Sequence, residues 1–207
     1  MAGTHRPTPP GNNGEKQVRT FVAIELPEAI RDALTGLQEK LREYGFRASW
    51  TRPENIHLTL KFIGDTAVSR IDSISGQMAA VAREQGPITL FARSVGVFPG
   101  ARRARVLWTG IGGAIDRLGI LKVDLEDGLA TVGCVRDDKR FAGHLTLARF
   151  KGAADPDRVV SMMEQFGGFA SEPFTADAIH LFESRLSPGG AVYTKLASCR
   201  LGGGPET

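Results

Sequence analysis

The sequence predicts an α+β protein built by duplication, with two similar halves that form two lobes around one central cleft. Three observations predict this fold. Strand and helix patterns follow each other in the same order twice, and both halves contain the motif H-L-T-L, at His57 and at His144. Of the 207 residues, 42% are apolar, which is enough to bury a substantial core. We expect two antiparallel-rich sheets with helices on the outside, and a cleft lined by the two motif strands.

The first half covers about residues 18–100. Its strand patterns alternate apolar and polar residues, and its helix patterns repeat apolar residues at helical spacing, as at Ile30, Leu34 and Leu37. Glycines stop the helices, and Pro99-Gly100 marks a turn. The expected elements are a strand at 18–26, a helix from Pro27 to Gly45, a strand at 56–63, a helix ending at Gly86 and a strand at 87–99.

The second half, about residues 101–200, repeats this order. Asp155 and Pro156 are typical of the N-cap and first position of a helix, because the carboxylate accepts free backbone N–H groups and proline lacks one. The segment Pro188-Gly189-Gly190 predicts a turn between the last two strands. The expected elements are a strand at 106–111, a helix from Ile115 to Gly133, a strand at 144–150, a helix from Pro156 to Phe166, and strands at 174–184 and 190–196.

The remaining segments are expected to be tails around one bilobal domain at residues 18–200. Residues 1–17 are polar and rich in proline and glycine, which predicts disorder and is unlike a secretory signal, and residues 201–207 are expected to be flexible. Cys134 and Cys199 stand alone, so we expect no disulfide framework and no structural metal. No apolar run reaches bilayer length. We therefore expect a cytoplasmic protein without membrane contact, and a monomer.

The shared H-L-T-L motifs carry the chemistry. Residues two apart on a strand point the same way, so His57 and Thr59 share a face, and so do His144 and Thr146. One imidazole can act as a base and the other as an acid near neutral pH, while both hydroxyls donate hydrogen bonds to an anion. This arrangement suits metal-free hydrolysis of a cyclic phosphodiester, and the formal net charge of +3 is compatible with an anionic substrate.

These motifs and their surroundings resemble a known family. The segments NIHLTLKFIGD and HLTLAR are similar to the paired motifs of the two-histidine phosphoesterase superfamily. TFVAIELPE at 20–28, RVLWTGI at 105–111 and LFESRLSPGGAVYTKL at 181–196 resemble the RNA 2′,3′-cyclic phosphodiesterase family, also called 2′-5′ RNA ligase. The resemblance extends from about Val18 to Leu196. It implies a bilobal fold, metal-independent hydrolysis of RNA 2′,3′-cyclic phosphate ends to 2′-phosphates, and no cofactor.

The resemblance also implies roles for individual residues. His144 would activate water as the base, and His57 would protonate the O3′ leaving group as the acid. Thr59, Thr146 and Arg149 would bind phosphate oxygens. Strict strand alternation places Arg149 on the face opposite His144, so its role requires a β-bulge or a position at the strand end.

Other candidate residues carry weaker signals. Phe141 and Tyr193 are candidates for stacking on a nucleobase, although an aromatic residue in a strand is more often part of the core. Three arginines after Pro99-Gly100 are more typical of a solvated loop than of an RNA contact, and their role stays open: Arg102, Arg103 and Arg105.

Several functions stay open at this point. The same histidines could catalyse the reverse reaction, an ATP-independent 2′-5′ RNA ligation. An ATP-dependent ligase is disfavoured, because no G-x-x-x-x-G-K-[ST] loop is present. The chain could also be a non-catalytic module that binds RNA ends, or a phosphodiesterase for a small cyclic nucleotide such as ADP-ribose 1″,2″-cyclic phosphate. The expected partner is RNA with a 2′,3′-cyclic phosphate terminus or a cyclic nucleotide.

Overall fold

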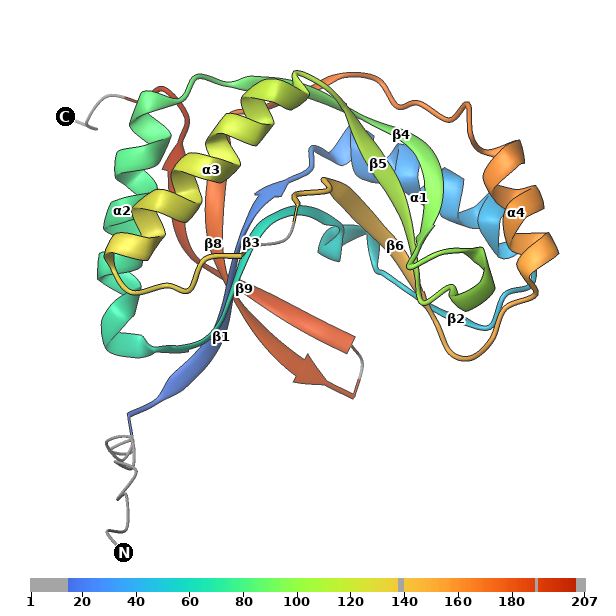
Figure 1. The fold of residues 1–207 in the computed structure, drawn as a ribbon, viewed down its shortest axis with the longest axis horizontal. Coiled ribbons are helices and arrows are strands. Elements are labelled where there is room, and N and C mark those ends of the chain that lie inside the picture. Colours follow the sequence, from blue (N-terminus) through green and yellow to red (C-terminus); the bar gives the residue numbers. More distant parts are fainter. Residues whose placement is uncertain (1–14, 138–139, 189, 204–207) are drawn as a thin grey trace, which may run out of the picture.

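The computed structural model describes residues 15–137, 140–188 and 190–203, and these residues form a curled sheet with helices against one face (Figure 1). The helices are α1 (Glu28–Arg42), α2 (Ile71–Glu84), α3 (Ile115–Thr131) and α4 (Pro156–Gln165). The strands are β1 (Gln17–Glu25), β2 (Ala48–Trp50), β3 (His57–Ala67), β4 (Ile88–Phe98), β5 (Val106–Gly113), β6 (His144–Phe150), β7 (Phe174–Ala176), β8 (Ala178–Ser187) and β9 (Gly190–Arg200).

The strand order is symmetric about its centre. It runs β7-β4-β5-β6-β3-β1-β8-β9, with β2 on β6, and neighbouring strands are antiparallel. The two motif strands β3 and β6 meet in the middle through the pair Leu58 and Leu145. The predicted α+β class with a duplicated order is confirmed. The two sheets that we expected are joined by this central pair into one curled sheet.

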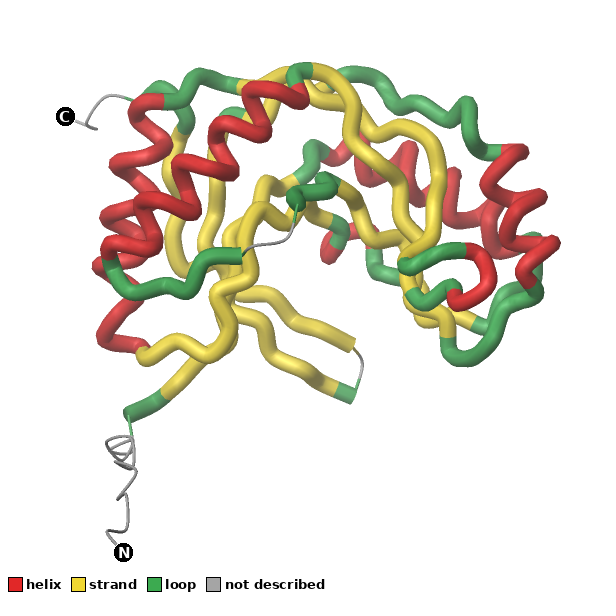
Figure 2. Tube along the Cα trace, in the orientation of Figure 1, coloured by secondary structure: helices red, strands yellow, loops and turns green. Residues whose placement is uncertain are grey.

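The lobes do not coincide with the sequence halves. One lobe contains β1, β3, β8 and β9 under α2 and α3, and the other contains β2 and β4 to β7 with α1 and α4 (Figures 1 and 2). Each lobe therefore takes strands and one helix from each of the halves 18–100 and 101–200. The first helix of each half packs on the lobe that contains the motif strand of the other half. Gln38 of α1 shows this, because its Nε2 donates to the carbonyl of Leu147 in β6 at 2.9 Å.

Alternation along the motif strands separates the core from the cleft. Leu58 and Leu60 of β3 are buried in the same apolar cluster as Leu145 and Leu147 of β6. The histidine and threonine of each motif lie on the opposite face of the sheet and are partly exposed. The helices cover the leucine face, so the other face is left for the cleft.

Each motif strand contains a β-bulge directly after its threonine. Leu60 has no partner on β1, and Leu147 has none on β5, because the register shifts by one residue at both places. A bulge reverses the alternation, so the two residues after each threonine both face the core. Phe62 and Arg149, which follow, are thereby returned to the cleft face.

Several element bounds differ from the sequence-based expectation. Strand β3 continues to Ala67, because β1 pairs with it along its whole length, and a short 3-10 turn at Val68–Arg70 precedes α2. The single strand expected at 174–184 is divided at Asp177, where the chain passes from β4 in one lobe to β1 in the other. Strand β2 was not expected. The N-cap of α4 is confirmed, since the Asp155 carboxylate accepts from the Asp157 backbone N–H at 3.0 Å.

The predicted tails lie largely outside the part of the chain that the structure describes. Residues 1–14 and 204–207 are beyond the described ranges. Leu201, which we assigned to a flexible tail, is buried, and the N–H of Gly202 donates to the carbonyl of Ala82 at 3.0 Å. The ordered chain therefore continues past residue 200. Within the described ranges, no helix is long and apolar enough to cross a membrane.

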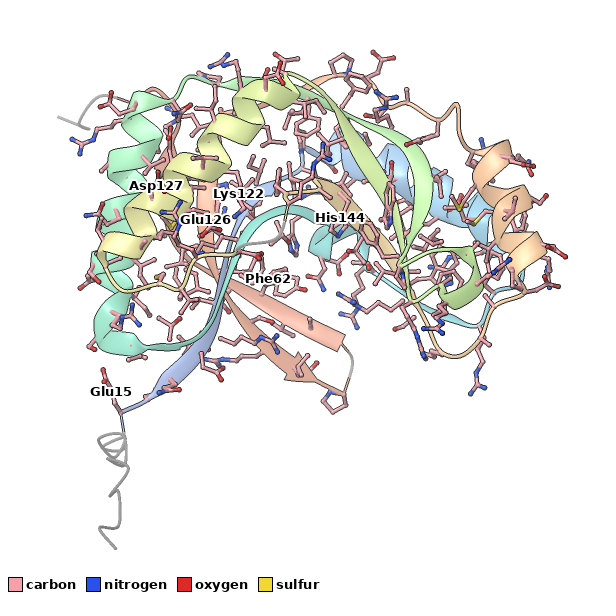
Figure 3. The ribbon with its side chains drawn as sticks, in the orientation of Figure 1. Glu15, Phe62, Lys122, Glu126, Asp127 and His144 are labelled. Atoms are coloured by element: carbon pink, nitrogen blue, oxygen red, sulfur yellow. The ribbon has the colours of Figure 1, made fainter. Side chains whose placement is uncertain are left out.

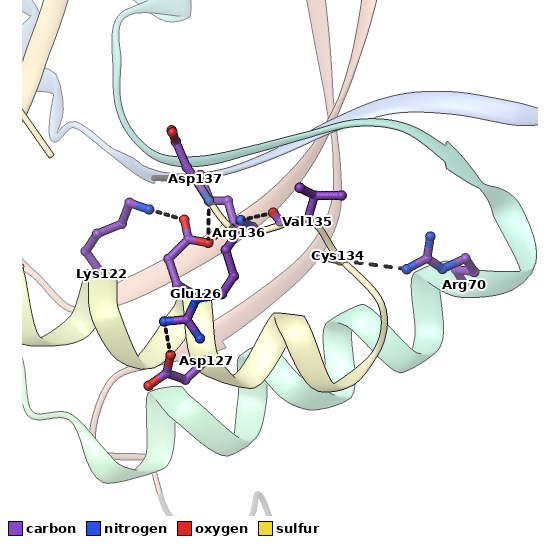
Figure 4. Close-up of polar contacts among 9 residues, drawn as sticks. Arg70, Lys122, Glu126, Asp127, Cys134, Val135, Arg136 and Asp137 are labelled. Atoms are coloured by element: carbon purple, nitrogen blue, oxygen red, sulfur yellow. Dashed lines mark hydrogen bonds and ion pairs between the residues drawn. The ribbon is translucent and has the colours of Figure 1, made fainter. Parts of the chain in front are cut away.

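A cluster of buried charges fixes β3 to α3 behind the cleft (Figure 4). Glu126 of α3 forms ion pairs with Lys61 of β3 and with Lys122 one turn earlier, and all three side chains are almost fully buried. Glu126 also accepts from the backbone N–H of Asp137 at 3.2 Å, and Lys61 donates to the carbonyl of Val135 at 2.8 Å. Burial raises the pKa of Glu126, but the hydrogen bonds from the two lysines outweigh it and hold the pKa below its usual value.

Replacing Glu126 should therefore be costly. Glu126→Gln leaves two buried ammonium groups without a counter-charge, and we expect the free energy of unfolding to fall by about 3–5 kcal/mol. The matched control is Asp127→Asn on the next residue, where the ion pair with Arg136 is about half exposed and should contribute about 1 kcal/mol or less. Urea denaturation of both variants measures the difference, and equal losses would contradict a structural role for the buried cluster.

Candidate active site

A cleft of about 360 Å³ opens on the face of the sheet that the helices leave uncovered. Both motif strands line it, together with β1, β4, β5 and the β8–β9 hairpin. Among the described lining residues two are arginines and none is acidic, so the cleft suits an anion. The lining residues are Arg19, Thr20, Phe21, Thr51, Asn55, His57, Thr59, Phe62, Phe98, Val106, His144, Thr146, Arg149, Ser184, Leu186, Ala191 and Tyr193.

The two histidines are held in the same way. Nδ1 of His57 lies 2.8 Å from the carbonyl oxygen of Asn55, and Nδ1 of His144 lies 2.7 Å from that of Ala142. A carbonyl can only accept, so Nδ1 carries the hydrogen in both rings, and Nε2 carries the lone pair when the ring is neutral. Each neutral imidazole can thus take a proton at Nε2, and each imidazolium can donate one from there.

Their surroundings differ. His57 stacks on Phe21 with ring centroids 4.8 Å apart, and the Tyr193 ring stands edge-on to it at 5.2 Å. The position of His144 is labelled in Figure 3. Its ring lies edge-on to Phe98, with centroids 5.0 Å apart, and to Trp108, with centroids 6.4 Å apart. Burial, with a smaller contribution from the charge of His144, lowers the pKa of His57 to about 4, against the opposing effect of its hydrogen bond to the Asn55 carbonyl. His57 is therefore neutral at pH 7 in the empty cleft.

The bulge in β6 brings Arg149 to the cleft. Leu147 is the extra residue and has no partner in the β5 register, and its carbonyl accepts from Gln38 Nε2 and from the Thr51 N–H, both at 2.9 Å. Gln38 is only 2% exposed, so its hydrogen bond to the Leu147 carbonyl lies within the core. Arg149 then lines the same cleft as His144 and Thr146, which is the arrangement that its expected role requires.

Not every candidate from the sequence lies in the cleft. Phe141 does not, because its ring packs against the core; a Cβ on Gly143 would lie 3.5 Å from that ring. Tyr193 does line the cleft, with its ring against His57 and Phe21. The three arginines of uncertain role are exposed and do not belong to the cleft lining: Arg102, Arg103 and Arg105.

The structure adds residues that the sequence analysis did not single out. Arg19 lines the cleft from β1, and Phe62 lines it from β3. Asn55 ties the β8–β9 hairpin to the start of β3, since its Nδ2 donates to the carbonyl of Ala191 at 2.9 Å. A signal for Phe62 was present in the sequence, because H-L-T-L-K-F and H-L-T-L-A-R place Phe62 and Arg149 at the same distance from their histidines.

Comparison with known proteins identifies the family. The sequence matches the LigT like Phosphoesterase family over residues 24–108 and 113–193. It is 30% identical to the RNA 2′,3′-cyclic phosphodiesterase of Thermotoga maritima, over 90% of this chain and 97% of that protein. It is 29% identical to the protein of that name from Methanothermobacter thermautotrophicus, over 89% of this chain and all of the relative.

Solved structures show the same fold. A Thermus thermophilus protein superposes with a TM-score of 0.77 at 27% identity, covering 89% of this chain and 98% of that chain. Escherichia coli LigT in its apo form superposes with a TM-score of 0.72 at 23% identity, covering 91% and 99%. The chain belongs to the LigT-like phosphoesterase family and is a phosphodiesterase.

Proposed function

We propose that this protein hydrolyses the 2′,3′-cyclic phosphate ends of RNA to 2′-phosphates, without a metal ion. The observation that carries the proposal is the meeting of two His-x-Thr pairs and Arg149 in one cleft that holds no acidic side chain among its described lining residues. The relatives named RNA 2′,3′-cyclic phosphodiesterase, which match over most of this chain, support the choice of substrate.

The reaction can be written with this chain's own groups. The phosphate lies between the motifs, where the hydroxyls of Thr59 and Thr146 and the Arg149 guanidinium bind its oxygens. Nε2 of His144 takes a proton from water as the water oxygen bonds to phosphorus. The bond from phosphorus to O3′ breaks on the opposite side, and Nε2 of His57 gives its proton to that oxygen. The product is a 2′-phosphate.

His57 must be protonated before it can act as the acid, and the bound substrate favours this protonation. A pKa of about 4 leaves this ring neutral in the empty cleft, so it cannot yet act as an acid. A bound phosphodiester anion favours the imidazolium and raises the pKa. We infer that the substrate's own charge prepares the acid. In 2′-5′ ligation a 5′-hydroxyl takes the place of water as the nucleophile at the same groups, and the product is a 2′-5′ linkage in place of a 2′-phosphate.

The first test is hydrolysis in the presence of a chelator. Adenosine 2′,3′-cyclic phosphate and a short RNA with a cyclic phosphate end should both be converted to 2′-phosphates in excess EDTA, because His, Thr and Arg side chains supply every proposed step. Product isomers are separated by chromatography. Loss of activity that a divalent ion restores would contradict the mechanism, and a 3′-phosphate product would contradict the choice of leaving group.

The second test separates the roles of the two histidines. We expect His57→Ala and His144→Ala each to lower turnover of the RNA substrate by roughly a hundred- to ten-thousandfold. A nitrophenyl phosphodiester has a leaving group that needs no proton, so it should partly restore the activity of His57→Ala and not that of His144→Ala. Rescue of His144→Ala alone would reverse the acid and base roles. Equal rescue of the two variants would contradict the assignment of different roles.

The third test measures the charge on His57 directly. In NMR titrations of the phosphate-free protein, the His57 imidazole should titrate at about 4. Saturating inorganic phosphate should raise this pKa, because an anion beside the ring stabilises its protonated form. His57→Gln assigns the signal. A His57 pKa near 6.5 in the free protein, or one that phosphate leaves unchanged, would contradict preparation of the acid by the substrate.

A further inference from the structure

The end of β6 carries exposed positive charge beside the cleft. Lys151 follows the strand directly, and its backbone N–H donates to the carbonyl of Arg47 at 2.8 Å, so the antiparallel pairing of β6 with β2 continues past Phe150. Arg149 opposes Ser49 two residues earlier. Residues that oppose each other in an antiparallel pair place their side chains on one face, and the faces alternate along the strands. Lys151 and Arg47 therefore share the face on which Arg149 lines the cleft.

The turn between β4 and β5 brings three more cations to the same end of the sheet. Its arginines lie in and just after a 3-10 turn at Ala101–Arg103 and are exposed. The turn is tied to β6, because the backbone N–H of Phe150 donates to the carbonyl of Arg105 at 3.0 Å. Figure 1 shows the turn, β2 and the end of β6 together at one end of the lobe. We call six residues the basic strip: Arg47, Arg102, Arg103, Arg105, Arg149 and Lys151.

The charge of the basic strip is not neutralised by neighbouring carboxylates. Segments 44–53, 99–113 and 145–154, which contain the strip, have no aspartate or glutamate. The next acidic residue after β6 is Asp155, whose carboxylate accepts backbone N–H groups at the N-cap of α4. Between residues that the structure describes, no ion pair involves a member of the strip, and all six members are exposed. The formal net charge of the chain is only +3, so its positive charge is concentrated beside the cleft.

We propose that the basic strip binds the backbone phosphates of the RNA strand whose terminal cyclic phosphate lies between the two motifs. This inference rests on the proposed function, because the strip begins at Arg149, which binds the reacting phosphate in that proposal. A mononucleotide offers the strip no second phosphate, whereas a strand of several nucleotides places phosphates along it. The strip therefore selects RNA ends over small cyclic nucleotides. Phosphate contacts carry no base information, so this selection is independent of sequence.

Binding of RNA strands of different length to the complete chain tests the proposal. The probes are adenosine 2′-monophosphate and an RNA hexanucleotide with a 2′-phosphate end, measured by isothermal titration calorimetry at several salt concentrations. We expect the hexanucleotide to bind more tightly. Arg47→Gln/Lys151→Gln should weaken its binding roughly 5- to 30-fold at low salt and leave the affinity for the monophosphate unchanged. The slope of log K against log salt should become shallower by about 1.4, because two contacts to a single strand are lost.

Two further double variants complete the measurement. Arg102→Gln/Arg103→Gln should also weaken the hexanucleotide and spare the monophosphate, because it removes two charges from the turn. The matched control is Arg83→Gln/Arg200→Gln, which removes two exposed charges from α2 and from the end of β9, outside the basic strip. This control should change neither affinity.

Each outcome either supports the strip or overturns it. Equal affinity of the wild-type protein for the hexanucleotide and the monophosphate, or equal losses in the strip variants and the control, would overturn it. Hexaglutamate that binds as tightly as the hexanucleotide would overturn it too, because the strip would then be a general anion surface. Hydrolysis of adenosine 2′,3′-cyclic phosphate by the wild-type protein is assayed separately. A protein that binds RNA through the strip but leaves this nucleotide intact would uphold the strip and refute the proposed reaction.

Discussion

The pairing of β3 with β6 at Leu58 and Leu145 is the contact on which the site depends. Side chains alternate along a strand, so burying these two leucines in the shared core turns the flanking histidine and threonine of each motif to the opposite face. A register slip of one residue in either strand would turn its leucines to the cleft face and its histidine and threonine to the core. The free energy of core packing is therefore what holds four polar side chains around one point.

The bulge after each motif threonine modifies that rule. An alternating pattern alone would bury Phe62 and Arg149, and the extra residue at Leu60 or Leu147 returns them to the cleft. The carbonyl of Leu147 at the bulge accepts from the Thr51 N–H and from Gln38, which reaches it from α1. Because α1 packs on the lobe that contains β6, Gln38 can stabilise the bulged backbone that turns Arg149 to the cleft.

Much of this could be predicted from the sequence, and the exceptions have physical reasons. Periodicity indicated the helices and long strands, and the repeated H-L-T-L indicated which four side chains share a face. Periodicity carries no information on which lobe a strand joins, so the division of the chain at Asp177 between two lobes was missed. It also cannot show whether an aromatic residue faces core or cleft. Phe141, a candidate for base stacking, packs against the core, whereas Phe62, which strict alternation would place in the core, lies in the cleft.

Duplication gives two copies of one imidazole, and the proposed in-line displacement uses one as the base and the other as the acid. The edge strands of the sheet give the two imidazoles different surroundings. Beyond β1 lie β8 and the eleven-residue β9, which brings Tyr193 against His57, whereas the equivalent edge strand β7 has three residues and lies beyond β4. Phe21 and Tyr193 thus surround His57 with apolar surface, and burial there lowers its pKa to about 4. Unequal edge strands around a symmetric centre thus place two copies of one motif in different surroundings.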